Sequence, residues 1–435
     1  MQKINREILA LAIPSIITNI TTPLLALMDV VIVGHMGSPV YIAAIAVGGT
    51  LFNMMYWLFA FLRMGSSGLT AQANGADNGI ESNLVLIRGL LVAIIASLII
   101  ILLQNVICKY ALDFMEVEKE TRELADLYFS ILVWGAPAVL CTYSLSGWFL
   151  GLKNAKAPMW VSFIINITNI VLSLILVFVF KLKISGVATG TLSAQWIGLI
   201  IGMIIAYKKY HPTIPPIRVI VDSKELKRFF SINTDIFLRT LCLIAVTVWF
   251  TRVGSQQGTI ILAVNTLLMQ FFILFSYFMD GFAFAGESLC GNFIGAGNKT
   301  GLHTCINALF KWGTLMAVIF SIIYFLGGSS LMSIMTTDDV IVEHSKEYYY
   351  WVIAIPFAGF ASFTWDGIFI GATQTRAMLI SMATSTAIYF IMYFTLFHRL
   401  GNHGLWIAFI AYLLTRGIIL TLLRHRIRPK TNTII

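Results

Sequence analysis

Twelve long apolar stretches run through this chain of 435 residues, and they constrain its fold more than any other feature. A helix needs about 20 mostly apolar residues to cross the hydrocarbon core of a bilayer. The stretches that meet this condition are residues 8–34, 41–73, 84–107, 124–150, 159–180, 186–207, 232–252, 259–290, 304–326, 347–371, 377–397 and 404–423. We therefore expect an all-α polytopic membrane protein with twelve transmembrane helices.

The composition excludes soluble enzymes. Apolar residues make up 58% of the chain and charged residues 11%, compared with about 45–50% and about 25% in ordinary globular domains. So few charges could not cover the surface of a soluble protein. The net charge of +9 is attributed to loops on one side of a membrane rather than to a nucleic-acid partner. The five cysteines include no CxxC pair, which argues against a zinc site and a disulfide framework.

The distribution of lysine and arginine predicts the orientation. When the amino terminus is placed in the cytoplasm, 17 of these residues fall on that side of the membrane and 8 on the other. Loops on the cytoplasmic side of membrane proteins carry an excess of basic residues. We therefore expect a multi-pass protein of the cytoplasmic membrane whose two termini both face the cytoplasm.

An internal repeat divides the chain into two halves. Residues 75–78 (Gly-Ala-Asp-Asn) recur at 295–298 as Gly-Ala-Gly-Asn, and residues 147–151 recur in similar form at 367–371, both shifted by 220 positions. Each half has an even number of stretches, so both halves should insert in the same sense, related by an axis along the membrane normal. The predicted domains are an amino-terminal six-helix lobe at 1–207, a basic cytoplasmic linker at 208–230, a carboxyl-terminal six-helix lobe at 231–423 and a cytoplasmic tail at 424–435.

Asp29 is the most unusual residue of the first stretch. It follows the segment Pro-Leu-Leu-Ala-Leu-Met and precedes Val-Val-Ile-Val, so its own helix surrounds it with apolar side chains. A charge at the centre of a membrane helix costs about 2.5–3.5 kcal/mol or more, and burial favours the protonated, neutral carboxyl group. A group that exchanges a proton for another cation is what an antiporter needs. Alternatively, Asp29 meets interfacial water near the outer end of the stretch.

Prolines and amides supply candidate partners for this acid. Pro14 and Pro23 each remove a backbone hydrogen bond from the first stretch and permit a helix bend. In the fifth stretch, Asn166, Asn169 and Ser173 are spaced three and four residues apart, which places them on one helix face. Such polar side chains either hold membrane helices together or line a cavity. An amide can also hold a carboxyl group or a small cation.

Further charges fall within stretches of the carboxyl-terminal half. Arg239, Asp280, Glu287 and Asp366 are predicted to form an internal polar network. Structural pairing explains these charges as well as a direct part in transport does. No GxxxxGK[ST] nucleotide-binding motif occurs, so the sequence does not point to ATP as the energy source.

Four segments, taken together, resemble the multidrug and toxic compound extrusion (MATE) family, and in particular its DinF-like branch. They are residues 28–37, 147–152, 233–240 and 365–372, and residues 280–283 are similar to that branch as well. The resemblance implies two pseudo-symmetric six-helix lobes that form a V. It also implies export of varied, often cationic compounds driven by a cation gradient, with no enzymatic activity.

The resemblance also implies roles for individual residues. Asp29 matches the essential acid of the first helix, and Pro14 matches the bend position before it. The positions that match its polar partners are Tyr128, Asn166, Asn169 and Thr191. Ser173 stands where many relatives have an Asp, so this lobe has one carboxylate rather than two. That departure favours protons over a sodium site, which prefers several charged oxygen ligands.

The sequence therefore predicts a secondary antiporter in which inward H⁺ flux protonates Asp29 and drives the export of amphiphilic or cationic drugs. The first alternative is Na⁺ coupling at Asp29, Asn166, Asn169 and Thr191. The second is a flippase for a lipid-linked substrate, which the few and balanced intramembrane basic residues disfavour. No motif supports a membrane enzyme or a channel. We expect a monomer in the lipid bilayer, with no cofactor besides H⁺ or Na⁺ and no nucleic-acid partner.

Overall fold

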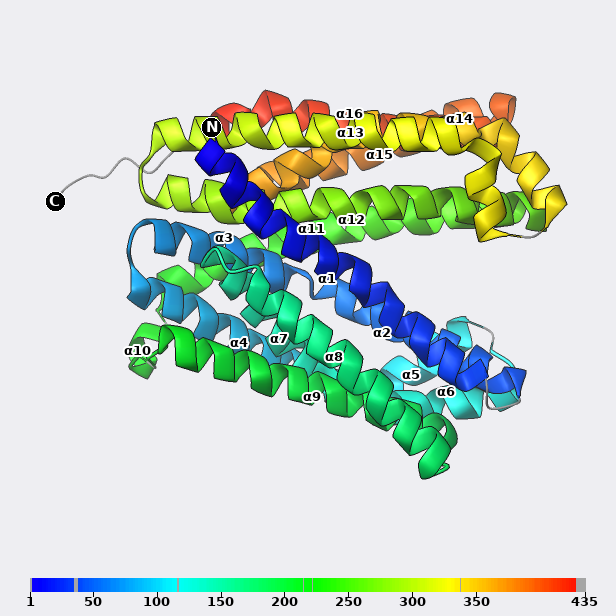
Figure 1. The fold of residues 1–435 in the computed structure, drawn as a ribbon, viewed down its shortest axis with the longest axis horizontal. Coiled ribbons are helices and arrows are strands. Elements are labelled where there is room, and N and C mark those ends of the chain that lie inside the picture. The colour runs from blue at the N-terminus through cyan, green and yellow to red at the C-terminus, as the bar shows by residue number, and fades with distance from the viewer. Residues whose placement is uncertain are drawn as a thin grey trace. The chain divides into compact units, whose positions relative to one another are not determined.

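A computed structural model describes residues 2–34, 38–115, 117–213, 215–220, 222–336 and 338–427. Twelve helices in this part of the chain are long and apolar enough to cross a membrane, and each overlaps one of the predicted stretches (Figure 1). The predicted all-α architecture is therefore confirmed. His35, Met36 and Gly37 of the segment at 28–37, and residues 428–435 of the predicted tail, lie outside the described residues.

The chain forms two compact units. The amino-terminal unit comprises Ile17–Arg228, and the carboxyl-terminal unit comprises Phe229–Ile435 together with Met1–Ile16. Helix α1 (Gln2–Gly34) therefore begins in the carboxyl-terminal unit and continues into the amino-terminal one. The division falls between Pro14 and Pro23, and the chain is helical through both prolines.

Several membrane spans of the amino-terminal unit are not continuous α-helices. Span Pro39–Gly75 turns at residues 59–60, where one helix ends and the next begins. A short 3₁₀ turn, η1 (Val133–Gly135), interrupts span Lys119–Gly151. A π-helical segment, η2 (Ile175–Val179), follows α8. The helices of this unit after α1 are α2 (Pro39–Leu58), α3 (Phe61–Gly75), α4 (Gly79–Leu102), α5 (Gln104–Phe114), α6 (Lys119–Leu132), α7 (Ala136–Gly151), α8 (Lys156–Leu174), α9 (Lys183–Tyr210) and α10 (Ile217–Ile220).

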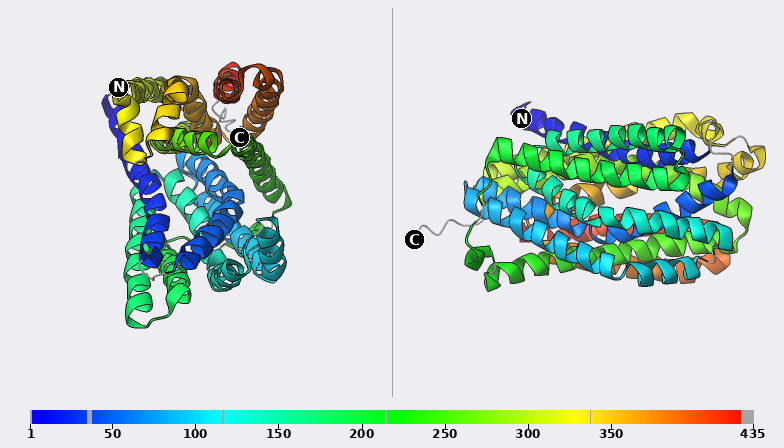
Figure 2. Two further views of the ribbon diagram at one scale, coloured as in Figure 1. Left: turned by 90° about the vertical axis from the view of Figure 1, so that its right-hand side faces the viewer. Right: turned by 90° about the horizontal axis from the view of Figure 1, so that it is seen from below.

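The carboxyl-terminal unit is built from longer helices. They are α11 (Ser223–Gln256), α12 (Thr259–Gly295), α13 (Lys299–Met335), α14 (Asp339–Gly371), α15 (Thr375–Leu400) and α16 (Asn402–Leu422), followed by the short η3 (Leu423–Arg426). Helix α14 packs against α12, α13 and α16, in the green to red part of the ribbon (Figure 2). Its residues are almost entirely buried towards its carboxyl end. Aromatic rings fill this core, for example Phe250 against Trp406 at 5.0 Å between ring centroids.

The repeated glycines explain why the two units share one framework. A Cβ atom on Gly147 would lie 2.1 Å from the backbone oxygen of Arg63, and one on Gly367 would lie 2.1 Å from that of Ala283. Both glycines and both of their neighbours are related by the same shift of 220 residues. Since no side chain fits there, α7 meets α3, and α14 meets α12, backbone against backbone.

Arg88 ties the predicted linker to the amino-terminal unit. Its side chain is buried within α4, and its Nε and Nη2 donate hydrogen bonds of 3.1 and 3.0 Å to the backbone oxygens of Ile220 and Val219. These carbonyls end the short helix α10, where intrahelical donors are lacking. Arg88 therefore lies inside α4 and binds the backbone of the segment that the sequence predicts to be a linker.

Candidate functional site

Asp29 lies buried in the amino-terminal unit, in the second half of α1. Its side chain is 5% exposed, and the side chains of Asn169 on α8 and Thr191 on α9 lie beside its carboxyl group. Among the residues that the structure describes, none donates a hydrogen bond to its Oδ1 atom. Asp29 is therefore a desolvated acid that faces neutral polar groups. The interpretation in which it meets interfacial water does not agree with this burial.

Asn169 and Thr191 form the polar wall beside this acid. The amide nitrogen of Asn169 donates a 2.7 Å hydrogen bond to Thr191 Oγ1, which in turn donates to the backbone oxygen of Val187 at 3.0 Å. These bonds fix the amide with its nitrogen toward Thr191, so its Oδ1 remains as an acceptor. That oxygen is buried and receives no hydrogen bond from the described residues.

Ser173 extends the same face of α8 by one turn. It is fully buried, and no described residue is hydrogen-bonded to its hydroxyl oxygen. Helix α9 approaches so closely here that a Cβ atom on Gly190 would lie 2.4 Å from this oxygen. The π-helical segment η2 begins two residues later, and single π turns are frequent at functional sites.

Tyr128 forms an apolar and aromatic boundary of the site. It is buried on α6, within electrostatic range of Asp29. Its ring packs on Gly48 of α2, where a Cβ atom would lie 2.5 Å from the ring, and meets the ring of Phe52 edge-on at 6.4 Å. The structure thus gathers Asp29, Asn169 and Thr191, with Tyr128 nearby.

Asn166 has a different position from the one that the shared helix face suggested. Its amide nitrogen donates a 3.1 Å hydrogen bond to the backbone oxygen of Thr21. Thr21 precedes Asp29 by eight residues, or about 12 Å of helix rise. Asn166 therefore holds the backbone of α1 just before Pro23, which cannot donate the usual helical hydrogen bond.

Pro14 lies in the part of α1 that belongs to the carboxyl-terminal unit. The helix packs tightly there, because a Cβ atom on Gly281 of α12 would lie 2.9 Å from the backbone oxygen of Ala12. The two prolines thus lie on either side of the point where α1 passes from one unit to the other. A bend of α1 at either proline would therefore occur close to the point where the helix passes between the units.

The carboxyl-terminal unit buries a cluster of three charges. Asp366 on α14 forms ion pairs with Arg239 on α11 and with Arg416 on α16. The guanidinium of Arg416 also lies over the rings of Phe363 and Tyr412, at 5.7 and 5.9 Å from their centroids. The cluster carries two positive charges against one negative charge.

Sequence reasoning did not assign Arg416 to this network, although its position within an apolar stretch was a signal, since buried charges in membranes need partners. The other two residues of the predicted network lie on α12. Glu287 is fully buried and Asp280 is half-buried, and both make further contacts within the protein. Among the residues that the structure describes, no three His, Cys, Asp or Glu side chains lie close enough together to hold a metal ion.

A family model settles the relationship that these features suggest. The model of the family described as MatE matches residues 14–175 and, a second time, residues 234–395. The chain belongs to the MATE family. Its two matches are shifted by 220 residues, so each half of the chain is one repeat of this transporter family. MATE proteins are transporters and not enzymes, as the sequence predicted.

Individual MATE relatives agree with this assignment. The chain is 35% identical to DNA damage-inducible protein F of Escherichia coli strain K12 over 418 residues, which cover 96% of this chain and 91% of the relative. Its fold matches the MATE transporter VcmN of Vibrio cholerae in a bent form, with a TM-score of 0.87, 16% identity and coverage of 98% and 97%. It also matches an outward-facing multidrug resistance MATE transporter with a TM-score of 0.86, 21% identity and coverage of 98% and 96%.

Proposed function

We propose that this MATE transporter is an antiporter of the cytoplasmic membrane that exports amphiphilic, often cationic compounds in exchange for protons, with Asp29 as the group that binds the proton. The observation that carries the proposal is the burial of Asp29 beside neutral partners. A carboxylate in this position costs free energy that a bound proton removes. Asp29 can therefore alternate between a charged and a neutral state as its surroundings change.

The cycle follows from this exchange. A proton from the outside neutralises Asp29, whose neutral carboxyl group then lies against the polar side chains of Asn169 and Thr191. Removing the charge lowers the cost of packing α1 against its neighbours, so α1 bends near Pro23 and the exported compound leaves outward. Exchange of one proton for one monovalent cation moves no net charge, so the pH gradient drives it. When a neutral compound is exported, the membrane potential adds ~2.3 kcal/mol per proton and 100 mV.

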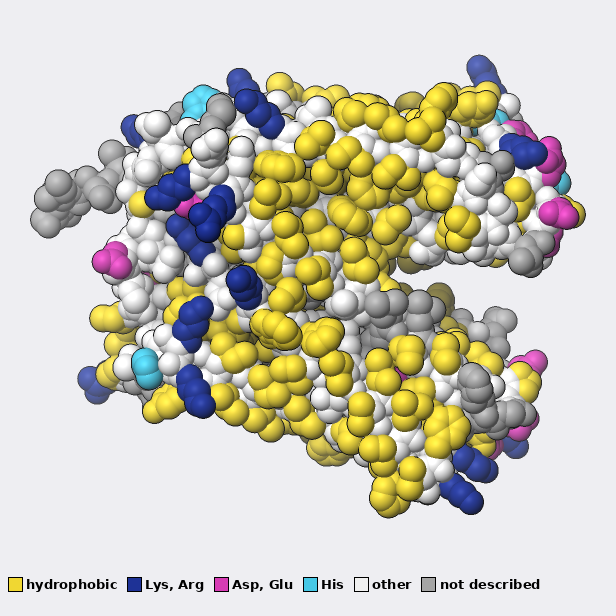
Figure 3. Space-filling view, viewed as in Figure 1, with side chains coloured by type: hydrophobic (Ala, Val, Ile, Leu, Met, Phe, Trp, Pro, Cys, Tyr) yellow, Lys and Arg dark blue, Asp and Glu magenta, His cyan; other side chains and the backbone are white. Residues whose placement is uncertain are grey.

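The orientation proposed from the basic residues agrees with the charges on the protein surface. On the face of the carboxyl-terminal unit seen in Figure 3, Lys and Arg side chains gather at one end of the helices, and Asp and Glu are more frequent at the other end. The basic end belongs in the cytoplasm. Lys3, Arg6 and Lys299 are among the residues that this orientation places there.

Sodium is the second candidate for the coupling ion. Two buried oxygens of α8, Asn169 Oδ1 and Ser173 Oγ, receive no hydrogen bond from the described residues and are the kind of ligand that Na⁺ accepts. Of these two residues, Asn169 lies beside the acid. Only one carboxylate is available in this group, because Ser173 occupies the place of the second. We therefore favour the proton.

Transport by the purified protein in liposomes, with a pH gradient and a Na⁺ gradient imposed separately, tests the proposal. We expect the pH gradient alone to drive uptake of a fluorescent lipophilic cation into inside-out vesicles. Asp29→Asn should abolish this uptake while the protein remains folded, and Glu120→Gln, which alters an exposed acid at the start of α6, should not change it. Uptake driven only by Na⁺ would contradict the proton, and full activity of Asp29→Asn would remove Asp29 from the mechanism.

A further inference from the structure

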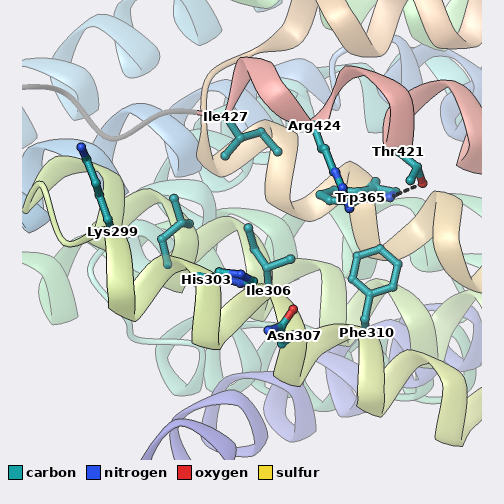
Figure 4. Close-up of a pocket in the computed structure, with 10 residues that line it drawn as sticks. Lys299, His303, Ile306, Asn307, Phe310, Trp365, Thr421, Arg424 and Ile427 are labelled. Carbon is teal, nitrogen blue, oxygen red and sulfur yellow. Dashed lines mark hydrogen bonds between the residues drawn. The ribbon is translucent and has the colours of Figure 1, made fainter.

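A cavity of about 570 Å³ lies within the carboxyl-terminal unit (Figure 4), and none of the three charged residues of the cluster around Asp366 lines it. Its walls come from the first turns of α13, from α14, and from the end of α16 with η3. Nothing in the transport cycle proposed above uses it.

The rim of this cavity is basic. Lys299 and His303 on α13 and Arg424 on η3 line it, and none of its lining residues is acidic. This differs from the buried arginines of the same unit, which share Asp366. The cavity also lies at the amino-terminal end of α13, where the helix dipole favours a negative charge. An anion is therefore the ligand that this rim would attract.

The deeper wall of the cavity is apolar. Trp365 is 4% exposed, and its ring packs against Phe310 at 4.8 Å between centroids. The indole nitrogen of Trp365 already donates a 2.8 Å hydrogen bond to Thr421 Oγ1, which itself donates to the backbone oxygen of Gly417 at 2.7 Å. Because these polar atoms are satisfied, Trp365 and Phe310 offer a ligand only apolar contact, and Asn307 on α13 adds one amide to the lining. Figure 4 shows Arg424 extending from η3 toward Trp365, so the basic and apolar parts adjoin.

We propose that this cavity binds an anionic phospholipid of the cytoplasmic leaflet, with its headgroup phosphate between Lys299 and Arg424 and its acyl chain along Phe310 and Trp365. Ammonium and guanidinium groups bind phosphate through charge-assisted hydrogen bonds. Basic pockets between membrane helices on the cytoplasmic side suit anionic headgroups. The apolar wall distinguishes a lipid from free phosphate, which would gain nothing from it. The depth in the membrane rests on the orientation proposed above.

Lipid binding to the purified full-length protein tests this site. Native mass spectrometry in detergent would count bound phosphatidylglycerol and bound phosphatidylethanolamine for the unaltered protein, for Lys299→Gln/Arg424→Gln, and for the control Lys208→Gln/Lys209→Gln at the exposed end of α9. We expect the first double variant to bind phosphatidylglycerol about thirtyfold more weakly, and the control to bind it like the unaltered protein. Binding of phosphatidylethanolamine should be the same in all three.

Two controls separate lipid binding from a folding defect and from binding of free phosphate. Lys299→Arg/Arg424→Lys, which keeps both charges, should bind phosphatidylglycerol normally. An unchanged melting temperature of Lys299→Gln/Arg424→Gln would show that its loss of binding is not a folding defect. Inorganic phosphate at millimolar concentration should not displace the lipid, and displacement would show that the site takes free phosphate instead. Equal loss of phosphatidylglycerol in both double variants, or no loss in either, would overturn the proposal.

Discussion

The amino-terminal and carboxyl-terminal units place different side chains at equivalent positions of the same helical framework. The shift of 220 residues between the two family matches sets Asp29 against Trp249, Asn169 against Tyr389 and Ser173 against Tyr393. Trp249 and Tyr393 meet edge-on at 5.8 Å between ring centroids. Aromatic packing thus fills the place that a titratable acid and its polar partners occupy in the first unit.

The reverse holds for the buried charges of the second unit. The positions equivalent to Arg239 and Asp366 are Asn19 and Ser146, both neutral. In the carboxyl-terminal unit the charges are paired with one another, whereas Asp29 of the amino-terminal unit has neutral neighbours. Paired charges hold a structure, and a lone acid can change its charge. The comparison supports a coupling function for the first unit and a supporting function for the second.

The helices of the two units also differ in how continuous they are. Helices α12, α14 and α15 run without a break, although α14 contains Pro356. Their counterparts in the amino-terminal unit are interrupted by a turn, by the 3₁₀ segment η1 and by the π-helical segment η2. Interrupted helices have fewer regular backbone hydrogen bonds and deform more easily. Helix α13 of the second unit is also broken, at Gly328, so the contrast concerns α12, α14 and α15 and their counterparts. In our proposal, the unit with the titratable acid is also the one that changes shape.

The largest effect is expected from Asp366→Asn. This change leaves Arg239 and Arg416 as two buried positive charges without a counter-ion, and breaking such a pair costs about 3–5 kcal/mol. We expect a strongly lowered melting temperature in detergent and poor recovery of folded protein. Ser146→Ala, at the equivalent position of the other unit, should leave the melting temperature nearly unchanged. A stable Asp366→Asn variant would mean that the charge cluster does not support the second unit.

A smaller effect is expected from Gly190→Ala. The added methyl group would collide with Ser173, so α8 and α9 must separate beside the acid, at a cost of about 1–3 kcal/mol. We expect slower proton-driven transport and a moderately lower melting temperature. The control is Gly49→Ala on α2, where no atom lies within 4 Å of the new Cβ. Equal rates for the two variants would contradict the close approach of α8 and α9 at the site.

The smallest effect is expected from Asn166→Ala. It removes one hydrogen bond to the backbone of α1, worth about 1 kcal/mol, about 12 Å of helix rise from the acid. We expect transport to continue with a reduced rate and an unchanged preference for protons over Na⁺. Asn169→Ala, which removes a neighbour of Asp29, should reduce transport further. If the order of the two variants were reversed, Asn166 would have the more direct part in coupling.

The sequence was sufficient to predict the spans and the repeat. The residue pattern singled out Asp29 and Asn169, whereas Thr191 and Tyr128 came only from the resemblance to the family. Hydrocarbon thickness sets the length of every span, and an isolated acid in an apolar stretch is visible without coordinates. The partner of Asn166, the pairing of Arg416 with Asp366 and the contact of Arg88 with the linker join residues far apart in the chain, so spacing could not reveal them. The π-helical segment η2 contains no proline or glycine, and its irregularity has no local signal in the sequence.

The release of protons on ligand binding tests the central claim most directly. A transported lipophilic cation would be added to the purified protein in weakly buffered detergent solution, and a pH indicator would report the protons released. We predict about one proton per bound cation for the unaltered protein and none for Asp29→Asn, because the acid must give up its proton before the compound is bound. Equal proton release from the two proteins would contradict the account.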